Sequence, residues 1–337
     1  MRTMIWENRW HPLLERWVTI SSHRGARPWQ GARVSEIGKA PSYDPECYLC
    51  PNGRRISGAR NPNYDQVFVF DNDHPAFGVD APVTSPSQEP YLTSRAEGIC
   101  RVMCYSPDHS GRLSGLKALD MQRVIEVWHD QTQMLLAQDE IDQVFIFENN
   151  GEVVGVSNPH PHCQIYALPF VLPVTQQIIS ALTSYRARQK VNLFDDIIAR
   201  EIADGRRLLS ESSDWIAFVP FFAQLPYETW IVAKQPIRDL THASKASQGQ
   251  LGEMLTEVLG MQDRLWPTPQ AYILSIHQAP KSLSAESDYR CYIQIQPMLR
   301  GAGLQKYLAG VETAGGHFLN DGAPEEKAAE LRATRSA

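Results

Sequence analysis

The clearest signal in this chain is the stretch over residues 157–166, which reads Ser157-Asn158-Pro159-His160-Pro161-His162-Cys163-Gln164-Ile165-Tyr166. Side chains alternate between the two faces of an extended strand, so His160, His162 and Gln164 are predicted to share one face. The two prolines fix their own φ angles and stiffen the approach to the strand. The stretch therefore predicts a rigid strand that presents two imidazoles and an amide to one side.

Such a segment suits the transfer of a phosphoryl or nucleotidyl group. A neutral imidazole is a good nucleophile near neutral pH, and its bond to phosphorus is reactive enough to pass the group on. Gln164 can donate a hydrogen bond to a phosphoryl oxygen but cannot act as an acid or base toward water, which favours transfer over hydrolysis. The alternative interpretation is a stiff turn with two solvent-facing histidines.

The hydrophobic periodicity predicts a mixture of strands and helices around this segment. Helices are expected from Asp120, as a capping residue, to about Gln138, from Thr175 to Gly205 with a break near Asn192, over Leu251–Leu265, and from Pro324 onward. Asn149-Asn150-Gly151 is typical of a β-turn. Strands are expected at Trp17–Ser21, Gln66–Phe70, Ile99–Tyr105, Val144–Phe147, Cys163–Leu168, Trp215–Pro220, Glu228–Ala233, Tyr272–Ile276 and Cys291–Gln296.

A similar order of elements recurs in the two halves of the chain. Each half contains two strands, a polar connection, a helix, a strand, a loop and a further strand, which indicates an old duplication. We therefore expect an α+β fold of two similar halves with antiparallel sheet flanked by helices, divided into residues 1–172 and 173–337. The strand Cys291–Gln296 would be the counterpart of the strand that carries His162.

A second chemical signal is the pair Cys47-x-x-Cys50, which lies in a loop between proline-containing turns. A redox pair would normally open a helix, so the loop context favours a metal. Structural Zn²⁺ takes four ligands, and His109 and His160 would complete a Cys₂His₂ set that anchors the loop presenting His162. The alternative is a pair of loop thiols without metal.

Composition limits the remaining classes of function. The 337 residues are 43% hydrophobic and carry a net charge of −6, and no basic stripe of the kind used to bind nucleic acid is present. No apolar run is long enough to span a membrane, and the first ten residues do not resemble a secretory signal. We therefore expect a cytoplasmic protein that binds neither nucleic acid nor membrane.

The central motif, from Gly155 to Gln164, resembles the signature of the galactose-1-phosphate uridylyltransferase family, in the histidine-triad superfamily. The likeness extends over most of the chain, because weaker motifs follow in the family's order. These motifs are His23–Gly31, Cys47-x-x-Cys50, Phe70–Asp73, Ser106–Ser110, Phe147–Asn149, Pro226–Thr229, Lys306-Tyr307 and Val311-Glu312.

The resemblance implies two histidine-triad-like halves, a homodimer, and a ping-pong reaction in which a nucleotide sugar, usually UDP-glucose, donates its nucleotidyl group to His162 and a sugar phosphate collects it. It places Ser157 with His162 and Gln164 in the reacting centre, and zinc at the four residues named above. The implied nucleotide contacts are Arg24, Arg27, Ile56, Asn72, Asp73, Asn149, Gly155, Val156, Ser157 and Gln164. The implied sugar contacts are Lys306, Tyr307, Val311 and Glu312.

The chain also departs from the family pattern. Many members hold a second metal with a glutamate and three histidines, but here His277 alone matches, and Tyr292 and Gln294 occupy the place of the late histidine pair. We therefore predict that the second metal site is absent. Two other functions remain open: a related nucleotidyltransferase or phosphorylase with another nucleotide or acceptor, such as inorganic phosphate, and a zinc-held binding module without catalysis.

Overall fold

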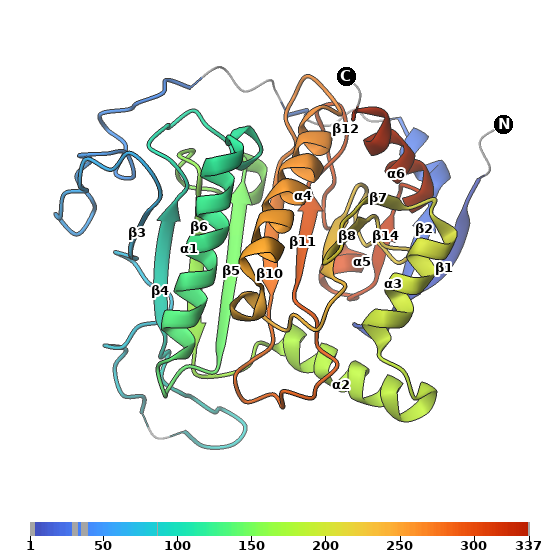
Figure 1. The fold of residues 1–337 in the computed structure, drawn as a ribbon, viewed down its shortest axis with the longest axis horizontal. Coiled ribbons are helices and arrows are strands. Elements are labelled where there is room, and N and C mark those ends of the chain that lie inside the picture. The colour runs from blue at the N-terminus through green and yellow to red at the C-terminus, as the bar shows by residue number, and fades with distance from the viewer. Residues whose placement is uncertain (1–3, 29–32, 35–39, 86, 336–337) are drawn as a thin grey trace.

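The fold is built on a large antiparallel sheet, seen in a computed structural model that describes residues 4–28, 33–34, 40–85 and 87–335. Within these residues the sheet has nine strands in the order β3-β4-β6-β5-β10-β11-β9-β8-β7 (Figure 1). The strands are β3 (Phe68–Asp71), β4 (Ile99–Cys104), β5 (Gln143–Asn150), β6 (His162–Leu168), β7 (Leu208–Glu211), β8 (Trp215–Phe218), β9 (Thr229–Ala233), β10 (Tyr272–His277) and β11 (Tyr292–Pro297).

Two long helices cover one face of this sheet, α1 over the strands of the first half and α4 over those of the second (Figure 1). Both were expected from sequence, although α1 begins at Ala118 after Lys117, so the prediction that Asp120 caps it was wrong. The helices are α1 (Ala118–Leu136), α2 (Pro173–Gln189), α3 (Leu193–Asp204), α4 (Lys245–Asp263), α5 (Gly310–Thr313) and α6 (Pro324–Ala333).

The sheet order shows two related halves that meet at the centre. The first half reads β3-β4-β6-β5 and the second, in mirror sequence, β10-β11-β9-β8, with β5 paired to β10 so that Ile146 lies opposite Ile276. In this arrangement β11 occupies the same place in its half as β6 does in the first. The expected α+β fold with two similar halves is confirmed.

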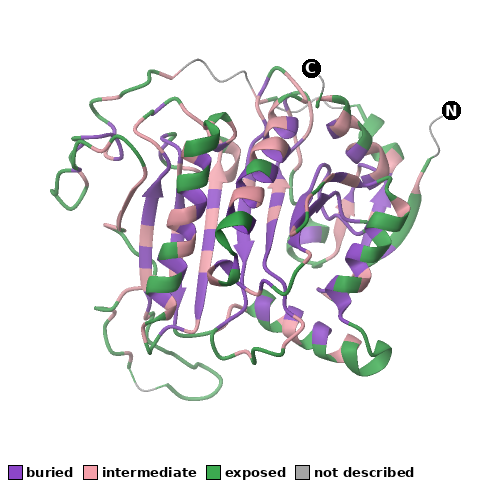
Figure 2. Ribbon diagram, viewed as in Figure 1, coloured by how far each residue is buried: buried purple, intermediate pink, exposed green. Residues whose placement is uncertain are grey.

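Alternation along β6 separates the core from the functional face. Cys163, Ile165 and Ala167 are buried in the core under the long helices, together with Trp128 of α1. His162 and Gln164 point to the opposite face, because neighbouring side chains on a strand point to opposite sides. Figure 2 shows the resulting pattern of buried strands beneath helices whose outer faces are exposed.

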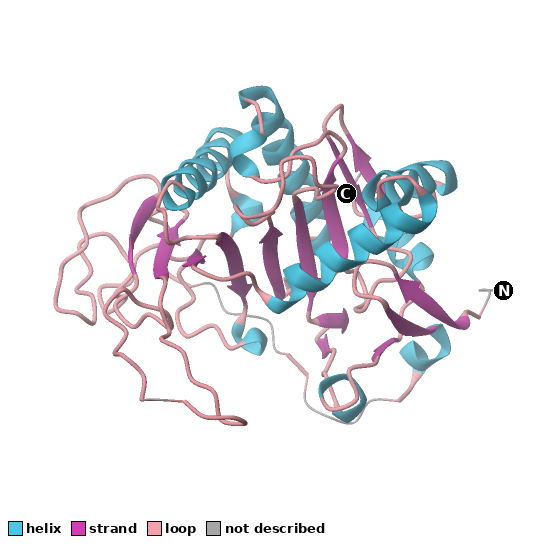
Figure 3. Cartoon of the chain, turned by 90° about the horizontal axis from the view of Figure 1, so that it is seen from below, coloured by secondary structure: helices cyan, strands magenta, loops and turns pink. Residues whose placement is uncertain are grey.

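The two halves differ in what covers this opposite face. In the second half, α2 and α3 pack there, with Phe194 of α3 in one buried cluster with Trp230 and Tyr292. In the first half, long loops take that role, and they gather at the β3–β4 end of the molecule (Figures 1 and 3). The face that carries His162 is therefore covered by loops in the first half, and the equivalent face is packed with apolar side chains in the second.

Both ends of the chain pack against the second half. A three-stranded sheet joins β1 (Trp6–His11) and β2 (Arg16–Ser21) to β14 (Phe318–Asn320), which runs parallel to β2. Glu325 at the start of α6 accepts from Arg9 Nη1 at 2.9 Å and from Arg207 Nη1 at 2.7 Å, a buried network that links the two ends. The remaining strands, β12 (Leu299–Gly301) and β13 (Leu304–Gln305), form a small hairpin.

The end of β5 differs from the sequence prediction. Asn149 and Asn150 are the last residues of β5 rather than part of a β-turn, so that prediction was wrong; Gly151 then leaves the strand with φ +100°.

In the described part of the chain, no helix has the length and apolar character that crossing a membrane requires.

Candidate active site and metal centre

His162, the first residue of β6, borders three adjoining cavities. One, of about 280 Å³, is also lined by Ile56, Asn72 and Asp73 from the loops around β3. A smaller one is lined by Asn149, Gly155 and Val156. Ser157 and Gln164 border both of these cavities. The structure thus gathers around His162 most of the residues that the sequence assigned to a nucleotide.

One hydrogen bond fixes the chemical form of the His162 ring. Its Nδ1 lies 2.7 Å from the carbonyl oxygen of His160, and a carbonyl only accepts, so Nδ1 carries the proton and donates. The lone pair is then on Nε2, which has no hydrogen-bond partner among the described residues. Burial lowers the pKa of His162, although the hydrogen bond to the His160 carbonyl acts in the opposite direction. The lowered pKa favours the neutral ring. A neutral ring with a free lone pair on Nε2, at the border of the three cavities, has the form that a nucleophile needs.

A similar contact orients Gln164. The Tyr166 hydroxyl donates to Gln164 Oε1 at 3.2 Å, which leaves the amide N–H groups available. Gln164 lies two residues after His162 on the same face of β6, so its amide can donate to an oxygen of a group held at His162. The site therefore supplies a neutral donor beside a neutral nucleophile.

Cys47, Cys50, His109 and His160 form a buried cluster that could hold a metal ion. Their ligand atoms all lie within 4.8 Å of one another. Cys50 Sγ is 3.6 Å from His109 Nδ1 and 3.5 Å from His160 Nδ1. A tetrahedron with ordinary zinc–sulfur and zinc–nitrogen bond lengths has S···N edges of about 3.5–3.6 Å, so the donor set fits this ion.

The surroundings of the cluster prepare its donors for a cation. His160 Nε2 is 3.0 Å from the carbonyl oxygen of Ser106 and donates to it, which leaves the Nδ1 lone pair facing the cysteines. Asn158 Nδ2 lies 3.4 Å from Cys47 Sγ and can donate to it, while Asn158 Oδ1 accepts from the His160 N–H at 2.9 Å. Because the His160 carbonyl holds His162 Nδ1, the cluster also positions the candidate nucleophile.

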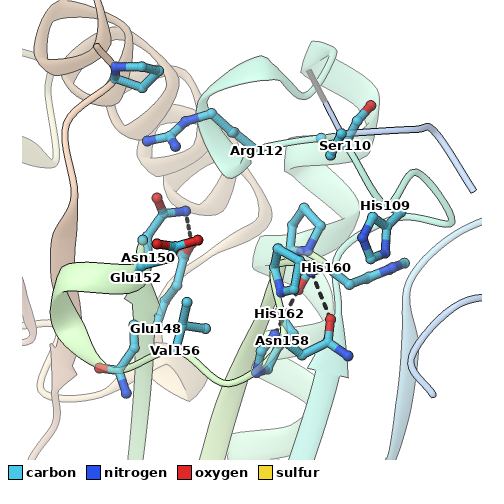
Figure 4. A pocket seen from close by; sticks show the side chains of 17 residues that line it. His109, Ser110, Arg112, Glu148, Asn150, Glu152, Val156, Asn158, His160 and His162 are labelled. Atoms are coloured by element: carbon cyan, nitrogen blue, oxygen red, sulfur yellow. Dashed lines mark hydrogen bonds between the residues drawn. The ribbon is translucent and has the colours of Figure 1, made fainter. Parts of the chain in front are cut away.

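The third cavity, of about 520 Å³, has a polar wall that sequence reasoning missed. Arg112, Glu148 and Asn150 lie on one side of it in Figure 4, opposite the three histidines. Glu148 accepts from Tyr105 Oη, Asn150 Nδ2 and Tyr272 Oη at 3.0, 2.9 and 3.3 Å. Burial raises the pKa of Glu148 to about 7. The signal in the sequence was a carboxylate at an inward position of β5, after Val144 and Ile146.

Six of the sequence-assigned contacts lie elsewhere. Arg24 and Arg27 are exposed at the turn after β2, and Lys306, Tyr307, Val311 and Glu312 lie at or near α5. None of the six lines a cavity that His162 borders. Figure 1 places α5 and β14 on the far side of β5, β10 and β11 from β6.

The counterpart of the site in the second half has a different chemistry. His277 stacks on Tyr292 with ring centroids 4.4 Å apart, and its Nε2 bonds to Ser275 Oγ and Gln294 Oε1 at 3.1 and 3.2 Å. Gln294 also donates through Nε2 to the buried Glu228 at 2.8 Å. His277 is a satisfied core residue; the absence of a metal there stays a prediction.

Comparison with known proteins identifies the family. Sequence models of the galactose-1-phosphate uridyl transferase N-terminal and C-terminal domains match residues 1–172 and 179–337. This chain belongs to that family. The galactose-1-phosphate uridylyltransferase of Haemophilus influenzae is 37% identical over 329 residues, covering 96% of this chain and 93% of that protein. The prediction that the chain is an enzyme of this family is confirmed.

Solved structures agree with this assignment. A structure described as a uridylyltransferase has a TM-score of 0.80 and 26% identity, with 98% of both chains covered. An ADP-glucose phosphorylase from Arabidopsis thaliana has a TM-score of 0.77 with 97% of both chains covered. At 23% identity, the second likeness shows that the two proteins share a fold.

Proposed function

We propose that this member of the galactose-1-phosphate uridyl transferase family moves UMP from UDP-glucose to galactose 1-phosphate through a nucleotidyl group carried on His162. The observation that carries the proposal is the His162 ring at the border of the cavities, with Nδ1 held by the His160 carbonyl so that the lone pair is on Nε2. The names of its relatives supply the nucleotide and the sugar.

The reaction would proceed in two balanced steps. His162 Nε2 attacks the α-phosphorus of UDP-glucose, the bond to the bridging oxygen breaks, and glucose 1-phosphate leaves with that oxygen. An oxygen of the galactose 1-phosphate phosphate then attacks the same phosphorus, and the N–P bond breaks to restore His162. Gln164 would steady the phosphoryl oxygens, while Asn72 and Asp73 would hold the ribose side of the nucleotide in the cavity near Ile56.

The substrates are tested by a screen with two arms. UDP-, ADP- and GDP-glucose, each labelled in the nucleotide, are incubated with the enzyme, and the adduct on His162 is identified by mass spectrometry. Each adduct is then chased with galactose 1-phosphate, other sugar phosphates or inorganic phosphate. Labelling by UDP-glucose and release by galactose 1-phosphate support the proposal. Efficient release by inorganic phosphate alone would instead assign a phosphorylase.

We also propose that the ion held by Cys47, Cys50, His109 and His160 is zinc. Two thiolates and two imidazoles in a closed, buried tetrahedral set are ligands that zinc prefers, and such a site contributes to folding rather than to chemistry. The bound ion would fix His160 and, through its carbonyl, the ring of His162.

We further propose a cytoplasmic location, because the six cysteines form no disulfide bonds and the cytosol keeps thiols reduced.

A homodimer would complete the site. Lys306 pairs with Glu312 at 3.0 Å, and Tyr307 and Val311 are 44% and 41% exposed, yet none of the four lines a cavity that His162 borders. If these residues contact the sugar, as the family motifs imply, they must come from a second copy. Arg24 and Arg27 would reach the phosphates in the same way.

A mixture of two inactive variants tests this arrangement. His162→Ala and Lys306→Ala protomers, co-expressed in equal amounts, should recover about a quarter of wild-type activity, because half the dimers are mixed and each has one intact site. Activity is measured on purified dimers, with each single variant as the control. Absence of recovery in dimers shown to be mixed would mean that each chain builds its site alone.

A further inference from the structure

The polar wall opposite His162 contains a donor and an acceptor without partners. Arg112 is fixed from behind: its Nε and Nη2 donate to both oxygens of Asp263 at 3.1 and 3.0 Å, and Nη2 also donates to the Gln270 carbonyl at 2.8 Å. Its Nη1 has no partner in the described part of the chain. Asn150 donates through Nδ2 to Glu148, while its Oδ1 is buried and likewise without a partner among the described residues.

Both groups line the 520 Å³ cavity that reaches His162, on the same side of it (Figure 4). Asn150 Oδ1 is buried without a partner among the described residues, which is costly, and the rigidly held Arg112 guanidinium lines the same cavity, so the two groups together indicate a ligand. Their rigidity has a clear source, since the Arg112–Asp263 pair joins the loop before α1 to the end of α4. The wall is therefore built before any ligand arrives.

The charges on this wall favour hydroxyl groups over a phosphate. The charge of Arg112 is already matched by Asp263, and two carboxyl side chains, Glu148 and Glu152, also line the cavity. A phosphate needs uncompensated positive charge or several N–H donors, which this wall lacks among its described residues. A sugar hydroxyl both donates and accepts one hydrogen bond, and it suits an open N–H beside an open carbonyl oxygen.

We propose that Arg112 and Asn150, together with Glu148, form a subsite for the hexose hydroxyls of the sugar phosphate that exchanges at His162. This inference rests on the proposed function and adds specificity-determining residues from the same chain as His162. Asn150 Oδ1 accepts from one hydroxyl and Arg112 Nη1 donates to a neighbouring one, while Glu148 holds the Asn150 amide in place. The subsite acts on the sugar and leaves the bond from phosphorus to His162 untouched.

The test separates the sugar from the chemistry by starting at the nucleotidyl-His162 adduct. Wild type, Asn150→Leu and Arg112→Lys are loaded by prolonged incubation with labelled UDP-glucose and freed of substrate. The adducts are then chased with galactose 1-phosphate, with glucose 1-phosphate, or with buffer alone, in which only water accepts the group. Arg112→Lys keeps the charge, but a single ammonium nitrogen cannot take the separate places of Nε and Nη2 on Asp263 and of Nη1 toward the cavity.

Both variants should slow transfer to the two hexose phosphates by about tenfold or more, the loss expected when a ligand hydroxyl loses its partner. Their hydrolysis in buffer should stay within about twofold of wild type, because the reacting atoms are unchanged. Ser114→Ala is the matched control: Ser114 donates to Asp263 from outside the cavity, so this variant loosens the same ion pair without touching the subsite. Thermal unfolding of all variants verifies that they fold.

Unchanged transfer to hexose phosphates in both variants would overturn the subsite, as would an equal slowing of hydrolysis, which would assign these residues to the support of His162. An equal effect of Ser114→Ala on hexose transfer would also overturn it, since the clamp alone would then explain the result. Failure of wild type to form any adduct would instead remove the proposed function, and the two failures are therefore distinct.

Discussion

Replacement of His162 by alanine should abolish formation of the nucleotidyl adduct and reduce exchange between UDP-glucose and glucose 1-phosphate by at least about 10⁴-fold. The loss is this large because the two-step route exists only if His162 Nε2 accepts the nucleotidyl group. The hydrogen bond from Nδ1 to the His160 carbonyl, at 2.7 Å, holds the ring and leaves the lone pair on Nε2. Isotope exchange at equilibrium measures the effect without requiring the second substrate.

His277→Asn provides the matched control, because His277 lies on the equivalent face of the second half and is also buried. Its ring stacks on Tyr292 and bonds to Ser275 and Gln294, so its loss should cost little activity and leave the metal content unchanged. Undiminished exchange in His162→Ala would remove the assignment of the nucleophile. A drop of one metal equivalent in His277→Asn would show that the second half holds an ion.

Removal of one cysteine of the metal cluster is the second change with a large expected effect. Wild-type protein should contain about one zinc per chain, and Cys50→Ser should lose it. The variant should be destabilised by roughly 3 kcal/mol or more, because buried donors lose their common partner. Activity should fall roughly tenfold to a hundredfold even though Cys50 touches no substrate, since His160 no longer fixes the ring of His162.

Elemental analysis, chemical denaturation and the exchange assay measure the three effects on one preparation. Cys291→Ala is the control, because Cys291 is a buried thiol of the second half outside the cluster and should keep its zinc while losing some packing. A metal-free wild-type protein, or a disulfide between Cys47 and Cys50 in the native enzyme, would contradict the zinc assignment. Full activity in zinc-free Cys50→Ser would break the proposed link from the metal to His162.

Local patterns were sufficient for the elements and for the central residues of the site. The positions of α2 and α3, with their break at Asn192, follow from the hydrophobic spacing and from a capping side chain that accepts from Phe194 N. The shared face of His162 and Gln164 follows from alternation along one strand. The cysteine pair and the two distant histidines came together as expected, because ligand chemistry constrains such a set whatever the distance along the chain.

Other features depend on contacts between distant segments and left no local pattern. The pairing of Arg112 with Asp263 joins residues 151 positions apart, and Asn150 faces this pair because β5 continues past the turn that the sequence suggested. Short strands such as β1 and β14 were not predicted, since they are stabilised by pairing with β2 rather than by their own periodicity.

Spacing within a strand and donor chemistry were enough to predict the candidate nucleophile, its neighbouring amide, the candidate metal ligands and the repeated order of elements. Tertiary structure alone decided which half has an open face, through the packing of α2 and α3 over Tyr292 and of loops over the first half. It also placed α5, which contains Glu312, beyond β5, β10 and β11 as seen from β6. Such placements depend on strand pairing and long-range packing, which many sequences satisfy and no short segment encodes.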